Sequence, residues 1–463
     1  MFNYNNFISY LPEIVTVIGM GINILLSFFK DKYVNKIANF ITYTTLLFGL
    51  YFLFTAQINS YTLFPHFFKI LISISTLLVL ILKTKKIYKL HFNIFILAST
   101  LFLMMIINSE NYLNLYVNIE LFSISLYFLM SMDKYKYSFS ETIKYMISST
   151  LASLFLLFGT AFLYGLTGSI SFYDISNYIN ENQNYSLSTY IVPYIFIISG
   201  IVFKVGILPF GKWIIDIYKN IDARVVTYIS VVPKLSIFVA LYKIVGIMIS
   251  FETTLLLILL SIFTALFGIF YGFSIKNFRG IMAASSYVNI SYMLIALAVY
   301  TKISMSAMIF YWLAYIFMNI GVFAGIIILE HSNLMNRNKD FRGYFYKNPI
   351  FSIALALCIL SLLGLPITSG FIAKIYLLAG ILNSGIIIIP VIFIMLFIMI
   401  VSVCFYIKPL KDMFITLPYN ENYVIKTKSA NKIVLYVCTF ITLFIGILPA
   451  LFIKLCETIS FYI

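Results

Sequence analysis

Four ionisable side chains lie inside long apolar stretches of this chain. Lys204 lies in the run that begins near Tyr190, and Glu120, Lys234 and Lys374 lie in three other apolar runs. At a rise of 1.5 Å per residue, Lys204 is about 20 Å along its helix, and Glu120 and Lys234 are about 12–15 Å along theirs. A charge at such a depth in a bilayer costs at least about 2.5–3.5 kcal/mol, and it commonly marks an ion or proton path.

One carboxylic acid and three amines in apolar helices can hold and pass protons. Burial disfavours the charged form of each group and a nearby opposite charge favours it, so such groups titrate together. The four residues therefore predict a proton relay that water completes. The alternative is a structural ion pair between Glu120 and one lysine, although one acid cannot neutralise three bases.

The sequence lacks the usual motifs of redox, metal and covalent chemistry. It has no Gly-rich phosphate loop, no CxxC pair and no nucleophile elbow. The cysteines are far apart in apolar runs and the histidines are scattered, so we expect no metal site and no cofactor in this chain. These residues are Cys358, Cys404, Cys438, Cys456, His66, His91 and His331.

Two of the lysines lie beside predicted helix breaks. Gly206 and Pro209 follow Lys204, and Gly364 and Pro366 precede Lys374. Proline removes a backbone donor and clashes with the preceding turn, while glycine relaxes the chain. In lipid, a broken helix persists only where the break is buried in protein or faces water. Water at these breaks would give the lysines access to protons.

The composition is that of a polytopic membrane protein. Of 463 residues, 62% are hydrophobic and 10% are charged, whereas soluble domains carry about 25% charged residues. Each apolar run is near the ~20 residues that a bilayer requires. We predict an all-α protein of about fourteen transmembrane helices, in which the seventh and twelfth are broken and the eighth contains Pro233. The spans are predicted near 10–29, 37–56, 66–83, 91–108, 112–131, 144–166, 190–210, 224–248, 253–274, 280–299, 304–330, 350–382, 385–408 and 432–455.

Basic residues alternate between the two sides of the predicted membrane. The odd-numbered connections carry 24 of the 31 lysines and arginines, and the even-numbered connections carry only Lys302. By the positive-inside rule, both termini face outward. The net charge of +15 thus reflects topology and not nucleic-acid binding. Lys69, Lys243 and Lys454 lie near span ends or the C-terminus, where we expect each amine to reach the membrane surface.

The two predicted breaks are five spans apart, which reverses their direction through the membrane. Paired interruptions of this kind indicate inverted repeats with a site at their interface. We therefore divide the chain into residues 1–90 with helices 1–3, residues 91–250 with the first repeat, and residues 251–410 with the second. Residues 411–463 form a cytoplasmic loop and helix 14.

Four stretches carry a resemblance to a known family. They are Asn118-Ile-Glu-Leu, Glu141-Thr-Ile-Lys-Tyr continuing through residues 148–168, residues 203–218 running on to Pro233-Lys234, and residues 360–376. They resemble the antiporter-like subunits of respiratory complex I. The resemblance is greatest to the subunit N family of bacterial NADH-quinone oxidoreductase, which is equivalent to mitochondrial subunit 2.

The resemblance implies a proton-translocating subunit of a membrane complex. Glu120 would match the glutamate that modulates the central lysine, Lys204, while Lys234 would be the connecting lysine and Lys374 the lysine on the exit side. Other complex I membrane subunits would be partners, alongside lipid and protons. The NAD, flavin, iron–sulfur and quinone sites would lie in partner subunits. The location would be a bacterial inner membrane, or alternatively the mitochondrial inner membrane.

The sequence departs from the family pattern at three places. Gly211 and Asn289 stand where many relatives have histidine, and the stretch from Asp222 replaces a loop with paired prolines. Asparagine can orient water but does not titrate near neutral pH. The link between the two halves is therefore expected to depend on water and not on a histidine relay.

The sequence also bears on three other possible functions. A subunit of a multi-component sodium/proton antiporter would share the fold and the lysines. A stand-alone secondary transporter would need substrate-sized polar clusters in its spans, and the sequence has few. A purely structural membrane scaffold gives no reason for three lysines at mid-bilayer depth.

Overall fold

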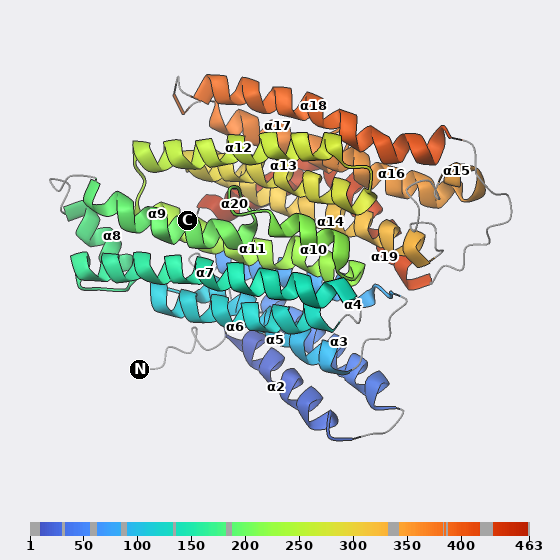
Figure 1. Ribbon diagram of the computed structural model, residues 1–463, viewed down its shortest axis with the longest axis horizontal. Helices are drawn as coiled ribbons and strands as arrows, with labels where there is room; N and C mark the ends of the chain where they lie inside the picture. The colour runs from blue at the N-terminus through green and yellow to red at the C-terminus, as the bar shows by residue number, and fades with distance from the viewer. Residues whose placement is uncertain are drawn as a thin grey trace.

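The helices lie side by side and run between two ends of the molecule, as the computed structural model shows in Figure 1. The structure describes residues 10–29, 33–55, 63–84, 90–132, 136–181, 188–331, 342–382, 384–385, 388–416 and 429–461. The two chain termini and several predicted basic-side connections, including those near residues 85–89, 332–341 and 417–428, lie outside the described residues.

Each of the fourteen predicted spans holds a helix or a broken helix pair. The first eight are α2 (Leu11–Leu26), α3 (Val34–Thr55), α4 (Leu63–Ile81), α5 (Leu90–Asn108), α6 (Tyr112–Ser131), α7 (Lys136–Thr167), α9 (Ser188–Val205) and α11 (Ala223–Ile247). The rest are α12 (Phe251–Ser274), α13 (Phe278–Val299), α14 (Lys302–His331), the pair α16 (Pro349–Leu363) and α17 (Ser369–Ile381), α18 (Ile388–Phe414) and α19 (Ser429–Ile447).

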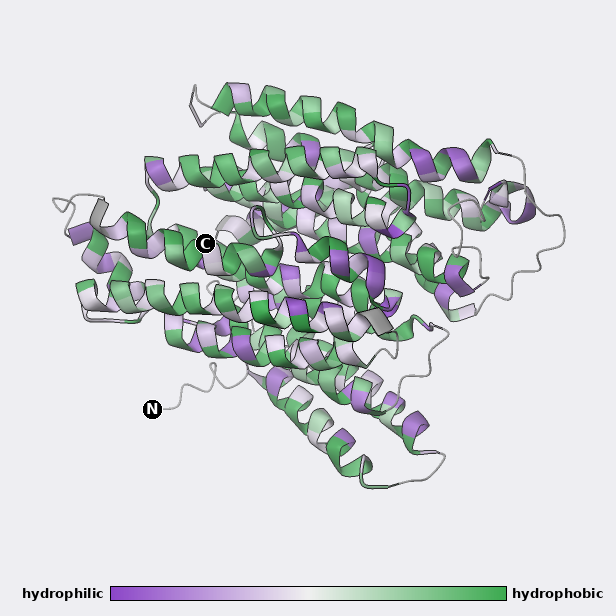
Figure 2. Cartoon of the chain, in the orientation of Figure 1, coloured by the Kyte–Doolittle hydropathy of each residue, from purple (hydrophilic) through white to green (hydrophobic). Residues whose placement is uncertain are grey.

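Length and composition support membrane crossing for these helices. Within the described residues, eleven are long and apolar enough to span a bilayer, and α2, α9, α16 and α17 are shorter apolar helices. α16 and α17 form one broken span. The eleven long helices, α2, α9 and this broken span make fourteen, so the predicted number is confirmed. Figure 2 shows the outer helices coloured mainly as hydrophobic along their length, as expected of surfaces that face lipid.

Four short helices were not predicted. α8 (Phe172–Glu181), α10 (Trp213–Asn220) and α15 (Tyr344–Lys347) lie in connections. The fourth, α20 (Pro449–Phe461), corrects the last span: the predicted helix over 432–455 ends at Ile447, and a new helix begins at Pro449. Proline fits the first turn of a helix because the missing N–H would have no partner there. The break thus follows from Pro449.

Pro233 does not interrupt its helix. α11 continues through it. An 18-residue stretch of α11 is entirely buried within the protein, as are such stretches of α13 and α14. Neighbouring helices can accommodate a proline inside a membrane helix. These three helices form the middle of the molecule and carry polar residues that lipid does not reach.

The two breaks share one backbone geometry. Gly206 after α9 has φ +87° and Gly364 after α16 has φ +94°. At each break the glycine N–H donates to the carbonyls three and four residues back, and the next N–H donates to the carbonyl five residues back. This is a Schellman arrangement, which ends a helix with a left-handed residue and suits glycine. The predicted broken helices are confirmed.

Helix packing follows the same order in both halves. α5 packs on α6 as α12 packs on α13, and α7 packs on α9 as α14 packs on α17. Together with the matching breaks, this pairing supports two five-helix repeats, α5–α11 and α12–α18. The division near residues 90, 250 and 410 stays a prediction.

Candidate functional site

Lys204 lies on the last turn of α9, where the side chains of three helices meet. Its Nζ donates to the hydroxyls of Ser123 at 2.8 Å and Ser149 at 2.6 Å. Glu120 Oε1 lies 3.6 Å from the same nitrogen and accepts a hydrogen bond from Ser153. The Lys204 side chain is 1% exposed and that of Glu120 is 23% exposed. The structure thus brings Glu120 and Lys204 together.

Helical spacing supplies these partners. Glu120 and Ser123 are three residues apart on α6, and Ser149 and Ser153 are four apart on α7, so each pair lies on one face of its helix. α7 and α9 also approach closely at Gly200, where an added Cβ would lie 2.6 Å from the Ala152 carbonyl oxygen. Two hydroxyls and a carboxylate can together accept from all three amine protons.

Lys234 lies inside α11 and is 1% exposed. Its Nζ donates to Ser286 Oγ of α13 at 2.5 Å and is 3.5 Å from the hydroxyl of Tyr218 of α10. Among the ion pairs of the described residues, none includes Lys234. Its surroundings are therefore hydroxylic and not acidic.

Lys374 reaches back across the break in its own span. From α17, its Nζ donates to the carbonyl oxygens of Leu362 and Leu363, each at 2.9 Å, and it lies 5.4 Å from the centre of the Tyr292 ring. These carbonyls belong to the last turn of α16, the end at which a helix dipole favours a cation. The described ion pairs contain no acid beside Lys374. Its ammonium group is held instead by backbone carbonyls at the end of α16.

A polar network surrounds Asn289, which stands where many relatives have histidine. Tyr311 donates to Asn289 Oδ1 at 2.8 Å, and Asn289 Nδ2 lies 3.1 Å from Ser285 Oγ. Tyr406 of α18 donates to the same Ser285 hydroxyl at 2.5 Å. The Tyr311 ring stacks on Tyr292 with centroids 6.3 Å apart. Through Tyr311 the network reaches the Tyr292 ring against which Lys374 lies. Ser286, the partner of Lys234, is the residue after Ser285 on α13.

Sequence reasoning missed most of this network. It identified Asn289 but not the serine and tyrosine hydroxyls, because these residues are common in membrane helices and give no distinctive spacing. The available signal was the run of polar residues Ser285-Ser286-Tyr287 in an otherwise apolar span. Hydroxyls can donate and accept at once, so these side chains are able to carry protons alongside water.

Of the lysines that were expected to reach the membrane surface, Lys69 is instead paired inside the protein, whereas Lys243 is partly exposed at a helix end. Lys69 is fully buried, and its Nζ lies 2.7 Å from Glu13 Oε1, which also accepts from Asn108 at 3.0 Å. Lys243 donates to the carbonyls of Ile107 and Ser109 at the end of α5. The sequence analysis did not identify Glu13 as the partner of Lys69. The two residues lie in the first and third predicted spans, with a whole span between them.

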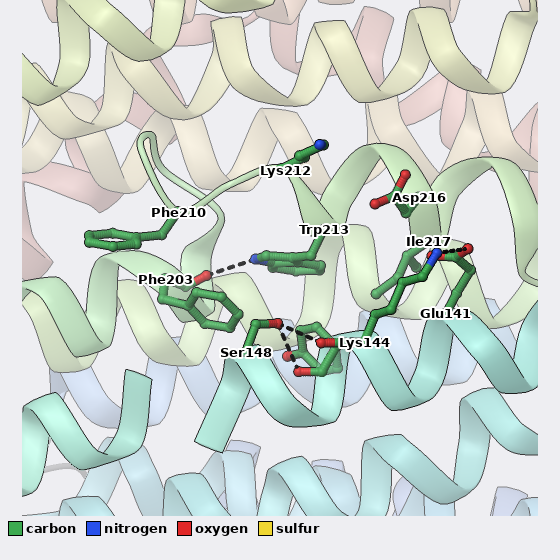
Figure 3. Close-up of a pocket in the computed structure, with 10 residues that line it drawn as sticks. Glu141, Lys144, Ser148, Phe203, Phe210, Lys212, Trp213, Asp216 and Ile217 are labelled. Atoms are coloured by element: carbon green, nitrogen blue, oxygen red, sulfur yellow. Dashed lines mark hydrogen bonds and ion pairs between the residues drawn. The ribbon is translucent and has the colours of Figure 1, made fainter. Parts of the chain in front are cut away.

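A pocket of about 400 Å³ lies between α7 and α10, and Phe203, the residue before Lys204, lines it (Figure 3). Glu141, Lys144, Lys212 and Asp216 supply its charged lining. Its aromatic lining consists of Tyr145, Phe203, Phe210 and Trp213. Trp213 is fixed by a 2.9 Å hydrogen bond from its ring N–H to the Phe203 carbonyl, which Figure 3 also shows.

Metal-ligating residues do not gather anywhere in the described part of the chain. No group of three His, Cys, Asp or Glu side chains there could hold a metal ion.

Residues 109–400 match the family described as NADH:quinone oxidoreductase/Mrp antiporter, TM. This match covers more than half of the chain. The chain belongs to this family. The resemblance inferred from the sequence is thereby confirmed, and the protein is a multi-span membrane protein. Glu120, Lys204, Lys234 and Lys374 all lie inside the matched region.

A curated relative carries a related name. The chain is 29% identical over 318 residues to NADH-quinone oxidoreductase subunit N of Wolbachia sp. subsp. Brugia malayi (strain TRS). The alignment covers 65% of this chain and 66% of that protein. The chain therefore spans slightly less than two thirds of that relative.

Solved structures share the fold. A chain of respiratory complex I from Thermus thermophilus superposes with a TM-score of 0.81 at 22% identity, covering 96% of this chain and 99% of that one. A chain of the Mrp complex from Dietzia sp. DQ12-45-1b gives a TM-score of 0.81 at 17% identity, covering 98% and 97%. At these identities the similarity shows the fold alone.

Proposed function

We propose that this chain is a proton-translocating membrane subunit of an NADH:quinone oxidoreductase. One observation carries the proposal: a lysine at a helix break, buried among two serine hydroxyls, with a glutamate 3.6 Å away. Family membership and the name of the Wolbachia relative support the same function.

Lys204 would be the first lysine of the relay to bind a proton. The Glu120 carboxylate favours the protonated amine, and Ser153 holds that carboxylate. A change that neutralises Glu120 or draws it away weakens this stabilisation, so Lys204 releases its proton. Lys234 then receives it, with Ser286 as the hydroxyl in contact.

The second half of the path ends at Lys374. The network of Ser285, Asn289, Tyr311 and Tyr406 provides donors and acceptors between Lys234 and Lys374. The carbonyls of Leu362 and Leu363 hold the Lys374 ammonium at the break. Release to the outer side follows when water replaces these contacts.

Electron transfer would take place in partner subunits. These would carry the NAD, flavin, iron–sulfur and quinone sites, and they would include other membrane subunits of the complex. Their redox steps would act on this chain as an electrostatic or conformational bias on Glu120 and Lys204. The complex would lie in a bacterial inner membrane or in the mitochondrial inner membrane, with both termini of this chain outside.

A subunit of a sodium/proton antiporter is the second candidate. The family includes Mrp antiporters, and the fold matches the Dietzia Mrp complex as well as complex I. Both solved structures are of complexes, which favours a subunit over a stand-alone transporter. Proton uptake driven by NADH oxidation supports the first candidate, whereas exchange driven only by a sodium gradient supports the second.

The Lys204 variants test the proposal in membrane vesicles that contain the whole complex. Lys204→Ala should lower both proton uptake and quinone-linked turnover while the subunit remains assembled on native gels. Lys204→Arg should also pump poorly, because guanidinium stays charged and releases no proton. Full pumping by the Arg variant would remove Lys204 from the relay.

A further inference from the structure

The pocket between α7 and α10 contains a buried carboxylate oxygen without a partner. Glu141 is 8% exposed, and its Oε1 accepts from Lys144 at 2.9 Å. Its Oε2 has no hydrogen-bond partner among the described residues. An unsatisfied buried oxygen is destabilising, and a bound water or a bound proton removes that cost. The pocket that Glu141 lines can admit both.

A second carboxylate lines the same pocket. Asp216 of α10 lines this pocket together with Glu141 and Lys144 of α7 and with Lys212 (Figure 3). The charges of these three residues and of Lys219 act on its carboxyl group. Tyr271 and Tyr287 also face it. Burial raises the pKa of the Asp216 carboxyl and Glu141 raises it further, whereas the three lysines lower it. Two carboxyl groups in one pocket can hold a proton between them.

Hydroxyl groups connect this pocket with Lys204. Tyr145 lines the pocket and lies four residues after Glu141, on the same face of α7. Its hydroxyl lies within reach of Ser149, and Ser149 contacts Lys204 Nζ at 2.6 Å. The Tyr145 ring packs on Trp213 with centroids 4.9 Å apart, which fixes its position. The order from solvent inwards is therefore carboxylates, Tyr145, Ser149 and Lys204.

We propose that this pocket is the proton entrance of the subunit and that Glu141 collects the proton for Lys204. The inference rests on the proposed function. A proton from water binds the free Oε2 of Glu141. Glu141 then releases the proton through water in the pocket to the Tyr145 oxygen, while the Tyr145 hydroxyl proton passes to Ser149 and that of Ser149 to neutral Lys204. Glu141 is left as a carboxylate and Lys204 as an ammonium, so one proton has moved.

Glu141→Gln tests this role in vesicles that contain the whole complex. The variant keeps the shape and loses the carboxylate, so proton uptake should fall by about tenfold at pH near 8, the lower range of the rate gain that a charged cleft gives. The loss should be small near pH 6, where protons are abundant. Glu141→Ala should regain uptake when formate, a small acid that fits the space, is added.

Two controls separate proton collection from a structural role. Lys144→Gln breaks the ion pair but keeps the carboxylate, so it should lose less than Glu141→Gln and show no added loss at high pH. Glu181→Gln removes an exposed acid on α8 and should pump normally. Equal losses in the Glu141 and Lys144 variants, independent of pH and without formate rescue, would overturn the proposal and leave Glu141 as an ion-pair partner.

The Lys204→Ala variant keeps the two proposals distinct. If Lys204→Ala stops pumping while Glu141→Gln pumps normally at both pH values, only the entrance is wrong. If Lys204→Ala pumps normally, the proposed function itself fails. Should Glu141→Gln not assemble on native gels, Asp216→Asn takes its place: a loss confined to high pH supports the entrance, and an unchanged profile overturns it.

Discussion

Lys204 Nζ lies 3.6 Å from Glu120 Oε1, at ion-pair distance but too far for a hydrogen bond. The strong contacts of each group go elsewhere: the amine donates to Ser123 and Ser149, and the carboxylate accepts from Ser153. The two groups therefore influence each other through charge while each is held separately. Such a pair can change its separation without either side chain losing all its partners.

Glu120 and Lys204 should be energetically coupled. Glu120→Gln removes the charge that favours protonated Lys204, so pumping should fall. The double change with Lys204→Ala should cost less than the sum of the single changes, with a coupling of about 0.5–3 kcal/mol. Pumping rates of the four forms of the cycle provide the measurement. Strictly additive losses would mean that the two groups act independently.

Lys374 should have separable roles in pumping and stability. Lys374→Ala leaves the Leu362 and Leu363 carbonyls without their donor, at about 1–3 kcal/mol for a buried group. It should therefore lower both pumping and the melting temperature of the complex. Lys374→Gln retains an N–H donor but cannot carry a proton, so it should recover stability and not pumping. A Gln variant that pumps normally would show that Lys374 is only a cap.

The tyrosine hydroxyls of the central network should matter for proton transfer. Tyr311→Phe removes the donor to Asn289 Oδ1 while keeping the ring, so pumping should fall with little loss of assembly. Tyr164→Phe, an exposed position on α7, is the matched control and should behave as the parent. Equal pumping by both variants would mean that water and not Tyr311 bridges this region.

Close packing at Gly200 should be necessary for the position of Lys204. Gly200→Ala would place a Cβ 2.6 Å from the Ala152 carbonyl oxygen, and the helices must separate, at about 1–3 kcal/mol. Thermal stability and pumping should both decrease. Gly165→Ala on α7 meets nothing within 4 Å and should be tolerated. If the two variants prove equally stable, the helix contact at Gly200 is not tight in the membrane.

Both termini are predicted to face outward from the asymmetry of the basic residues. They lie outside the described residues, so a fusion test decides the matter. A reporter that works only in the cytoplasm, placed after Ile463, should be inactive. Activity of that reporter would reverse the orientation.

The fold could be predicted because hydropathy and charge act over whole spans. Fourteen apolar runs, an alternating set of basic connections and two Gly/Pro breaks are enough to give the helices and the repeats. The break at Pro449 was missed because the apolar run continues on both sides of it. α8 and α10 are short amphipathic helices in connections, where no bilayer-length run identifies them.

The site was predicted only where one residue stood out by itself. Lys204, Lys234 and Lys374 are conspicuous in apolar spans, but their partners are serines, tyrosines and backbone carbonyls from other helices. The cap on α16 depends on how far the break turns the chain back, which no spacing reveals. The pairing of Lys69 with Glu13 likewise needs the packing of α2 against its neighbours.

The Glu13–Lys69 pair bears on how the chain enters its membrane during synthesis. α2 carries the acid and α4 the amine, and Asn108 of α5 also donates to the acid. A helix released alone into lipid would bear its charge there without a partner, which is unfavourable. Because α2 emerges from the ribosome well before α4, the Glu13 carboxylate has no lysine partner until α4 has been made. We expect the insertion machinery to retain α2 until α4 arrives, so that the first three spans leave it together.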